Sequence, residues 1–480
     1  NPQFQKGFSF AVQGPSYWKD IIRRNRVPVK RCPMKTNDRK KGMVFIVALW
    51  IVLVLAGLII VLARGARVEL LISANRLASL QAEWIAKGAL AFAIYQIDNM
   101  EEDEIVPGEF YDCEAVPIAG GYIWFLLPDY DDDLNYNFGI GDESGKLNLN
   151  TAPVEMLLML PGMTDELAAS IVDWRSSEEE STAGGAKSEY YLLLSPAYQC
   201  KSGPFETVEE VLLVKGASME VLFGEDTNRN GVLDENENDG AKSLPEDNID
   251  GVLNRGIYDF VTVYSNQTNV SRVQEQGTLV NVNSSNTTGL TELLRDVLDA
   301  NRLSTVMGMV RRGRPFENIL DFYARTGLSL AEFEKIAPQL TVGNRGRKEG
   351  LVNVNTAPRE VLTCLPGLEE VDVDALIDYR SMVEHTALKS IAWVAEVLPP
   401  EKAAEVGNWI TASSYQFSAD ILAVSGDGRA FKRFRAIIDR RSSPPQVISW
   451  QDLTGLGWPL APEILNNMRK GMTPYQTLMP

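Results

Sequence analysis

The chain has 480 residues, of which 46 are Lys or Arg, 64 are Asp or Glu and one is His, so its formal net charge is −18. About three domains fit this length, and a hydrophobic content of 45% is enough for well-packed cores. One histidine excludes multi-histidine zinc centres, and the acidic balance is opposite to the basic surface that nucleic-acid binding requires.

The first predicted element is a helix that crosses a membrane. Residues 43–63 form an uncharged apolar run of 21 residues. At about 1.5 Å per residue, a helix of this length spans roughly 31 Å, which is enough for a bilayer core. Apolar residues then recur at three- and four-residue steps without a proline, so we expect one helix over residues 43–97.

The charge on the two sides of this run predicts its orientation. Residues 1–42 carry a balance of +9 and residues 43–480 a balance of −27. By the positive-inside rule the N-terminal segment stays in the cytoplasm, and the acidic bulk of the chain is exported. A cleaved secretory signal peptide and a plain single-span anchor are the two alternatives. The run is longer than the core of a signal peptide, which disfavours the first of them.

The boundary at Gly42 resembles the class III signal of type IV pilins and type II secretion pseudopilins, in which a basic leader ends in glycine before a long apolar helix. The resemblance implies that a prepilin peptidase cuts between Gly42 and Met43 on the cytoplasmic side, and that Met43 becomes the methylated N-terminus. Met34 opens a leader of ordinary length over residues 34–42, so residues 1–33 are interpreted as an upstream extension.

The fifth residue after the expected cut is Val47, where most pilins carry a glutamate that pairs with the amino terminus of a neighbouring subunit. A membrane-embedded carboxylate is costly without such a partner. In lacking this acid, the chain resembles the minor pseudopilin family called general secretion pathway protein K. Members of that family occupy the tip of the pseudopilus and have no subunit above them. The resemblance implies a non-enzymatic, single-pass inner-membrane protein with its bulk in the periplasm, which caps the pseudopilus tip and contacts cargo or secretin. Implied partners are I- and J-type minor pseudopilins, the major pseudopilin, the prepilin peptidase and the inner-membrane assembly platform.

The predicted fold class is α+β, with a pilin-like N-terminal transmembrane helix and a small antiparallel sheet. Residues 98–144 and 417–445 contain alternating runs that we interpret as pilin-like strands, and residues 145–416 lie between them as a large inserted α-helical domain. This order of elements is the one that the K-type resemblance implies. Residues 446–480 form a C-terminal tail with no predicted role.

The insertion contains an internal repeat. Residues 145–175 recur at 350–380, and residues 277–290 open a weaker middle copy, which predicts three helical units. An apolar stripe begins 57, 35 and 35 residues after the first Asn of each Asn-x-Asn opening, and a short β-rich segment closes each unit. The units are expected over residues 145–276, 277–349 and 350–416, with openings at Asn148, Asn281 and Asn353 and apolar stripes that start at Phe205, Phe316 and Leu388.

The opening Asn-Thr-Ala-Pro followed by Leu-Pro-Gly resembles the helix-hairpin-helix (SAM-like) repeat of DNA-binding proteins, including the competence DNA receptor. It equally resembles the inserted domain of K-type pseudopilins. Hairpins that hold phosphate keep small residues after the glycine so that backbone N–H groups reach the anion. Here Asp165 and Glu369 follow the two glycines within three residues. We therefore expect structural hairpins, with a membrane-anchored DNA receptor as the alternative function.

A calcium loop is predicted inside the first unit, where oxygen-bearing side chains alternate around Gly231. Alternate oxygen ligands wrap a hard cation, the glycine makes the sharp turn, and the last glutamate can chelate through both oxygens. The alternative is an acidic turn without metal, and K-type pseudopilins are similar in binding calcium in this domain. The expected ligands are Asp226, Asn228, Asn230, the carbonyl of Val232, Asp234 and Glu237.

The remaining polar residues predict no catalytic centre. The single histidine, His385, is interpreted as a surface residue, and no convincing Ser/His/Asp or Cys/His set accompanies it. A calcium-dependent exported hydrolase is the third functional alternative. Cys113 and Cys200 can form a disulfide in an oxidising compartment, or they are buried thiols together with Cys364. A second calcium ion near residues 247–250 has a solvated loop as its alternative.

Overall fold

The computed structural model describes five stretches of the chain, residues 39–100, 105–106, 113–268, 279–343 and 347–474. The chain divides into two compact units, Asn1–Leu71 and Ile72–Pro480. The predicted leader up to residue 38 and the first two residues of the middle helical unit lie outside the described residues.

One helix, α1 (Arg39–Asp98), continues without a break from the apolar run into the second unit, which confirms the prediction of a single continuous helix. By length and composition it is able to cross a membrane, and the side chains of its apolar run are exposed. From Ala78 onward one face is buried. Small side chains at steps of three and four residues let this face lie close to the sheet. They are Ala82, Ala86, Ala89 and Ala93.

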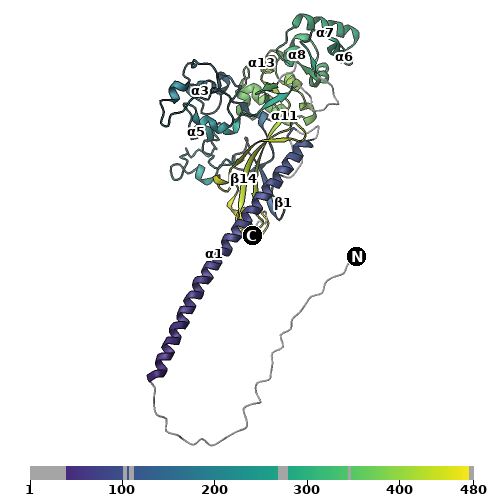
Figure 1. Ribbon diagram of the computed structural model, residues 1–480. Helices are drawn as coiled ribbons and strands as arrows, with labels where there is room; N and C mark the ends of the chain where they lie inside the picture. The colour runs from purple at the N-terminus through teal and green to yellow at the C-terminus, as the bar shows by residue number, and fades with distance from the viewer. Residues whose placement is uncertain (1–38, 101–104, 107–112, 269–278, 344–346, 475–480) are drawn as a thin grey trace, which may run out of the picture. The chain divides into compact units, whose positions relative to one another are not determined.

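The compact unit Ile72–Pro480 is built on one antiparallel sheet, which Figure 1 shows beside α1. The sheet has seven strands in the order β1-β2-β13-β14-β15, with β3 beside β2 and β4 beside β13. β2 and β13 pair directly although the helical insertion separates them in sequence. Strands predicted on both sides of the insertion are thus confirmed. Their bounds are β1 (Val116–Ile118), β2 (Gly121–Leu127), β3 (Asn137–Phe138), β4 (Gly141–Asp142), β13 (Gln416–Val424), β14 (Phe431–Asp439) and β15 (Gln446–Asp452).

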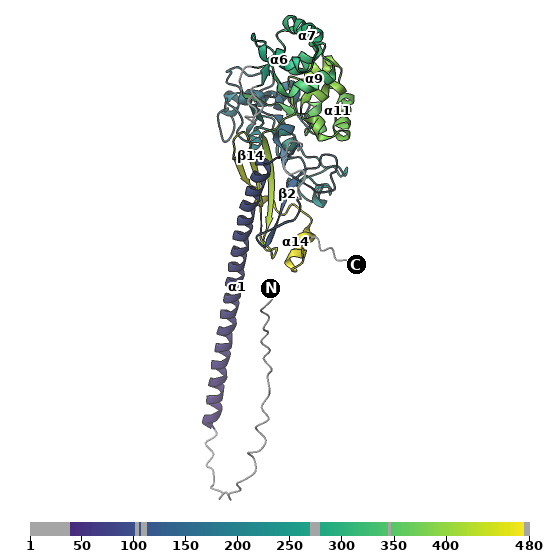
Figure 2. The same ribbon diagram turned by 90° about the vertical axis from the view of Figure 1, so that its right-hand side faces the viewer.

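Side chains alternate between the two faces of the sheet, as a pleated strand requires. Ile123 and Phe125 of β2 belong to a core shared with α1, whereas Trp124 and Leu126 belong to a core on the opposite face. Helix α14 (Pro462–Arg469) packs on that second face (Figure 2). The C-terminal tail, for which the sequence predicted no role, therefore adds β15 to the sheet and covers one of its faces.

Each helical unit is fastened at its base by two short parallel strands. The strand that contains the Asn-x-Asn opening pairs with the strand that closes the same unit. The short closing strands predicted from the sequence are thus confirmed. The pairs are β5 (Leu147–Asn148) with β6 (Val261–Thr262), β8 (Val280–Asn281) with β9 (Leu340–Thr341), and β11 (Val352–Asn353) with β12 (Ile410–Thr411); an antiparallel pair joins β7 (Asn266–Thr268) to β10 (Arg347–Glu349).

Short helices make up most of the rest of the three helical units (Figure 1). Their buried side chains form one large apolar core. The first unit contains η1 (Glu143–Gly145), α2 (Val154–Leu157), α3 (Asp165–Arg175), α4 (Ser188–Tyr191), η2 (Val208–Leu213), α5 (Met219–Phe223), η3 (Glu235–Glu237) and η4 (Tyr258–Phe260). The second contains α6 (Thr288–Arg295), α7 (Ala300–Gly313), α8 (Ile319–Thr326), α9 (Leu330–Ile336) and η5 (Ala337–Gln339). The third contains α10 (Arg359–Thr363), α11 (Glu370–Met382), η6 (His385–Leu388), η7 (Ile391–Trp393), α12 (Val394–Val397) and α13 (Pro400–Val406), and η8 (Thr454–Leu456) precedes α14.

The second Asn of each opening holds the residue at which the apolar stripe of its own unit starts. Its side-chain amide donates to the carbonyl of that residue, and in the first two units it also accepts that residue's N–H. The spacing seen in the sequence therefore has a physical cause, because one amide satisfies backbone groups that would otherwise be unpaired. The pairs are Asn150 with Phe205 (3.0 and 2.7 Å), Asn283 with Phe316 (2.8 and 2.9 Å) and Asn355 with Leu388 (2.8 Å).

The sequence left two alternatives for Cys113 and Cys200, and the disulfide between them is not formed. Cys113 lies in the core between the sheet and α1, whereas Cys200 lies in the helical core, and both are buried thiols, as is Cys364. Residues that enter different cores do not meet, so the alternative of three buried thiols describes the structure.

Candidate metal centre

The predicted calcium loop follows α5 in the first helical unit, includes η3 at its end, and folds back on itself. The carboxylate of Asp226 accepts the N–H groups of Asn230 (3.0 Å) and Gly231 (2.9 Å). Gly231 has a φ of +75°, and a Cβ at this position would stand 2.9 Å from the Cα of Pro128. Glycine is therefore required at this turn for both conformation and space.

The second half of the loop returns to the first through Asp234 and Glu237. Glu237 is only 1% exposed and accepts the N–H groups of Thr227 (3.0 Å) and Asp234 (3.2 Å). Asn228 and Asn230 both donate to one carboxylate oxygen of Asp234, at 2.6 and 3.1 Å. The structure thus brings every side chain predicted as a ligand into one closed loop.

Burial perturbs the acids of this loop. It raises the pKa of Asp226 to about 6, and the charge of Asp259 adds to the effect. Burial also raises the pKa of Glu237 to about 7, to which Asp226 and Asp234 contribute. Carboxylates that are crowded together and removed from water are stabilised by a hard cation with a preference for oxygen ligands. The donor set in this loop therefore fits a calcium ion.

The carboxylates of this loop are too few to hold a calcium ion by themselves. Within the described part of the chain, no three His, Cys, Asp or Glu side chains converge as a ready metal cage. A calcium ion in this loop would therefore draw on the amide oxygens of Asn228 and Asn230 as well as on the acids. The sixth predicted ligand is the carbonyl of Val232, a buried residue whose N–H donates to Asn230 at 2.8 Å.

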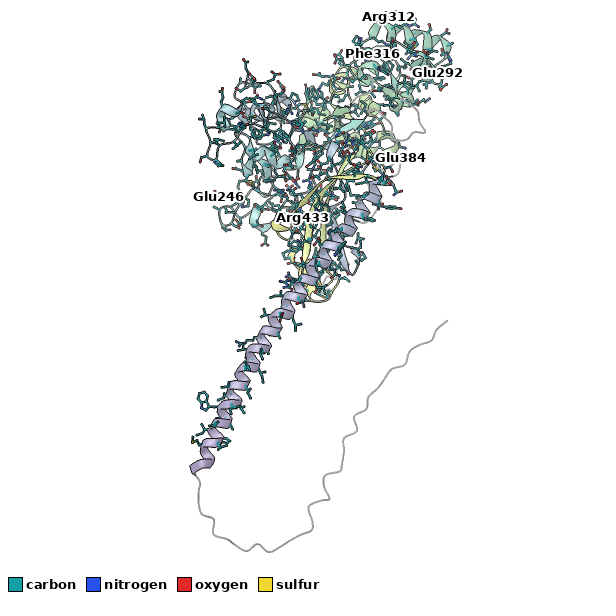
Figure 3. The ribbon with its side chains drawn as sticks, viewed as in Figure 1. Glu246, Glu292, Arg312, Phe316, Glu384 and Arg433 are labelled. Atoms are coloured by element: carbon teal, nitrogen blue, oxygen red, sulfur yellow. The ribbon has the colours of Figure 1, made fainter. Side chains whose placement is uncertain are left out.

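Sequence reasoning missed Arg433, a residue of the sheet that donates hydrogen bonds to the backbone of this loop. Arg433 of β14, which is labelled in Figure 3, is fully buried. It donates to the backbone carbonyls of Asn228 and Arg229. It also forms an ion pair with Asp420 of β13. The alternating pattern of β14 places Arg433 in a strand, but no local signal marks an arginine whose loop partner lies 205 residues earlier.

The second cation predicted near Asp247 has a different setting. Asp247 accepts the N–H groups of Asp239 and Gly240, both at 2.8 Å, and Asn248 donates to Asp250 at 2.8 Å. Asn248 and Asp250 are exposed. These contacts favour the alternative of a solvated polar turn, and a second calcium ion stays a prediction.

The helices that follow the two Leu-Pro-Gly turns are already capped. Thr164 accepts the N–H of Leu167 at 3.2 Å at the start of α3. At the start of α11, the carboxylates of Glu369 and Asp372 form a reciprocal capping box, and Lys402 donates to Asp372 at 2.6 Å. The protein's own side chains take the places where phosphate oxygens would bind, which disfavours the DNA-receptor alternative.

The other predicted positions lie on α1 and on η6. Gly42, Met43 and Val47 are all within α1, and the side chain of Val47 is 51% exposed. His385 begins η6 and is partly buried, with part of its side chain still at the surface. Cleavage after Gly42 stays a prediction.

Comparison with known proteins gives two matches. Residues 141–223 match the family model of type II secretion system protein K, a segment that runs from β4 through α5. A chain of the GspK–GspI–GspJ complex from the type 2 secretion system of enterotoxigenic Escherichia coli is similar in structure, with 11% sequence identity and a TM-score of 0.38 over 78% of this chain and 96% of that chain. No curated protein matches the chain.

Proposed function

We propose that this chain, whose residues 141–223 match the family model of type II secretion system protein K, is the minor pseudopilin that caps the tip of a pseudopilus. The family match lies in the helical insertion, whereas the K-type resemblance in the sequence began with the boundary at Gly42 and with Val47. Because these observations come from different parts of the chain, their agreement supports one family for both.

The observation that carries the tip position is the uncharged run of α1. Val47 stands at the fifth position after the expected cut, and the first carboxylate along the helix after that cut is Glu69. An ionisable side chain in a bilayer is tolerated when it has a partner. A subunit at the end of a fibre lacks one neighbour, so its helix dispenses with the acid that would pair with that neighbour.

The proposed partners are I- and J-type minor pseudopilins, which would pack against the apolar part of α1. Large apolar side chains such as Trp50 and Leu53 are exposed there. Helices in a membrane associate through close packing rather than through the hydrophobic effect, so shape complementarity along this surface would select the partners. The acidic helical insertion would then be the periplasmic head that meets cargo or secretin.

Co-purification and labelling of fibres test this proposal. The full chain, produced with I- and J-type pseudopilins and extracted in detergent, should be recovered in a complex with both. Immunogold labelling should find the chain only at fibre ends, and mass spectrometry should find an N-methylated Met43. Long fibres formed by the purified chain alone would contradict the tip assignment. An intact basic leader would instead favour the alternative of a plain single-span membrane anchor.

We also propose that the loop from Asp226 to Glu237 holds a structural calcium ion. The ion would neutralise crowded carboxylates and restrain a long connection of the first helical unit. Calorimetric titration of the full chain should detect calcium binding, and the double variant Asp226→Asn, Glu237→Gln should abolish it. No binding at millimolar calcium would contradict the site.

A further inference from the structure

Arg433 connects two parts of the fold that are distant in sequence, the calcium loop and the central hairpin of the sheet. We infer that Arg433 positions the calcium loop from the sheet side, so that calcium binding and the order of the β13–β14 hairpin depend on each other. This inference rests on the calcium site proposed above and goes beyond it, because it assigns a role to a residue that is not a ligand.

The guanidinium of Arg433 is 0% exposed and uses all three of its nitrogens. Nη1 donates to the carbonyl of Asn228, and Nη2 donates to the carbonyl of Arg229. Nε and Nη2 donate to the two carboxylate oxygens of Asp420, at 2.9 and 2.7 Å. One planar side chain therefore holds two successive loop carbonyls and one strand carboxylate.

These two carbonyls belong to the part of the loop that orients its ligands. Asn228 is itself a proposed ligand, and the peptide that follows Arg229 carries the N–H of Asn230, which donates to Asp226 at 3.0 Å. Arg229 has a φ of +56°, a conformation that costs energy for a residue with a Cβ. An external hold on this backbone therefore fixes how Asn228 and Asn230 present their oxygens.

Other contacts join the same loop to the sheet side of the molecule. Asn230 donates to the carbonyl of Pro459 at 2.8 Å, in the segment before α14. The N–H of Leu233 donates to the carbonyl of Asp133 at 2.8 Å, in the connection between β2 and β3. The loop is thus held at three points by segments that flank or form the sheet, and a change in its order is transmitted there.

A purely structural Arg433 would only satisfy Asp420, and breaking that buried pair would destabilise the protein with or without calcium. If calcium binding and the Arg433 contacts are coupled, the effect must act in both directions, because thermodynamic linkage is reciprocal. Whatever Arg433 adds to calcium affinity, calcium must add to the stability of the Arg433 contacts. Lysine keeps the positive charge but lacks the planar fork, so Arg433→Lys separates geometry from charge.

Calcium titration of the full chain in detergent tests the first direction of this coupling. Arg433→Lys should weaken calcium binding at least tenfold, because lysine cannot hold both carbonyls and Asp420 together. Arg429→Lys is the matched control, since Arg429 lies in the turn of the same hairpin and pairs with Asp427 at the surface. It should leave the affinity unchanged. Equal affinity in Arg433→Lys and the wild type would overturn the inference.

Hydrogen exchange of the wild-type chain tests the second direction and stays decisive even if Arg433→Lys does not fold. Calcium should slow exchange in the loop and in β14, and it should leave the β11–β12 pair unchanged. Protection confined to the loop would overturn the inference while the calcium site stands. A wild-type chain that binds no calcium would overturn both, and the fibre-end test of the K-type assignment is independent of either result.

Discussion

The first and third helical units are alike inside but are attached to the sheet by different chemistry. In both, the arginine near the end of the long helix turns back and donates to two carbonyls, one in the Asn-Thr-Ala-Pro segment and one in the residue just before it. This contact closes the hairpin in the same way at both places and explains why the two copies share that arginine. The donors and acceptors are Arg175 with Leu149 and Ala152, and Arg380 with Val354 and Ala357.

The third unit meets the sheet at a buried carboxylate, Asp142 at the end of β4. Asn353, Thr356 and Ser414 donate to one oxygen of this group, at 2.9, 2.6 and 2.6 Å. Burial raises the pKa of Asp142. The first unit is instead attached through Arg433 and the proposed calcium loop. The same repeat is thus joined to one sheet by neutral donors in one place and by Arg433 and the proposed calcium loop in the other. If that loop binds calcium as we propose, only the second attachment should respond to the ion.

Removal of calcium should produce the largest difference between the stabilities of the first and third units. Chelation should destabilise the first unit by about 2.7 kcal/mol if calcium had been present at a hundred times its dissociation constant. The third unit should keep its protection, because Asp142 is satisfied by the protein itself. Hydrogen exchange with and without chelator measures both units in one sample, and equal loosening of the two would contradict different attachment.

Asp142→Asn should have the next largest effect. An amide offers one acceptor oxygen and places an NH₂ group where a carboxylate oxygen received three donors, so we expect a loss of about 1–3 kcal/mol in the free energy of unfolding. The loss should be the same with and without calcium. Denaturant unfolding under both conditions measures this loss. A loss that depends on calcium would show that the attachments of the first and third units are not independent.

Arg175→Lys and Arg380→Lys test whether the hairpins of the first and third units are equivalent. Each should cost about 1–2 kcal/mol, because lysine cannot donate to two carbonyls through a planar fork. The expected result is near equality of the two losses in denaturant unfolding. If one variant were neutral while the other was strongly destabilising, the two hairpins would not be equivalent.

The last prediction concerns pH and Glu143 of η1, which pairs with Arg435 of β14 and accepts a hydrogen bond from Thr262 of β6. Burial alone would raise its pKa, but Lys146 and Arg435 outweigh burial and lower the pKa to about 2. Burial lowers the pKa of Lys146, so we take Arg435 as the partner that stays charged. Because the folded pKa of Glu143 is below the ordinary value of 4.5, its ionised form stabilises the fold above that pH.

This stability should be lost as the pH falls from about 4.5 toward 2, at up to about 1.4 kcal/mol for each pKa unit. Denaturant unfolding in steps between about pH 6 and pH 3 measures the slope. Glu143→Gln should flatten it, and an unchanged slope would assign the acid sensitivity to other carboxylates.

Sequence reasoning predicted the features whose causes lie close together in the chain. The continuous helix α1 follows from an unbroken apolar periodicity. The three closing strands follow from the spacing of the repeat, and the self-closed loop around Gly231 follows from alternating oxygen-bearing residues. The position of Phe205 and its counterparts was visible as a spacing, and the structure supplied its reason in the amide of Asn150.

Features that depend on distant partners were missed. Arg433 and Asp142 draw their partners from other units, and a strand pattern or a single acid carries no sign of such partners. The place of β15 is decided by its pairing with β14 rather than by its own composition. The choice between a disulfide and buried thiols stayed open for the same reason, because the core that Cys113 or Cys200 enters depends on the whole fold.

The direct pairing of β2 with β13 has a consequence for how the protein folds. Their register joins Tyr122 to Val424 and Leu126 to Asp420, with all the helical units between them in the chain. Closing so long a loop costs entropy before the strand contacts repay it. Each helical unit, by contrast, closes on its own strand pair. Folding should therefore proceed from the middle of the chain outward, and a chain cut short before β13 should yield folded helical units without a sheet.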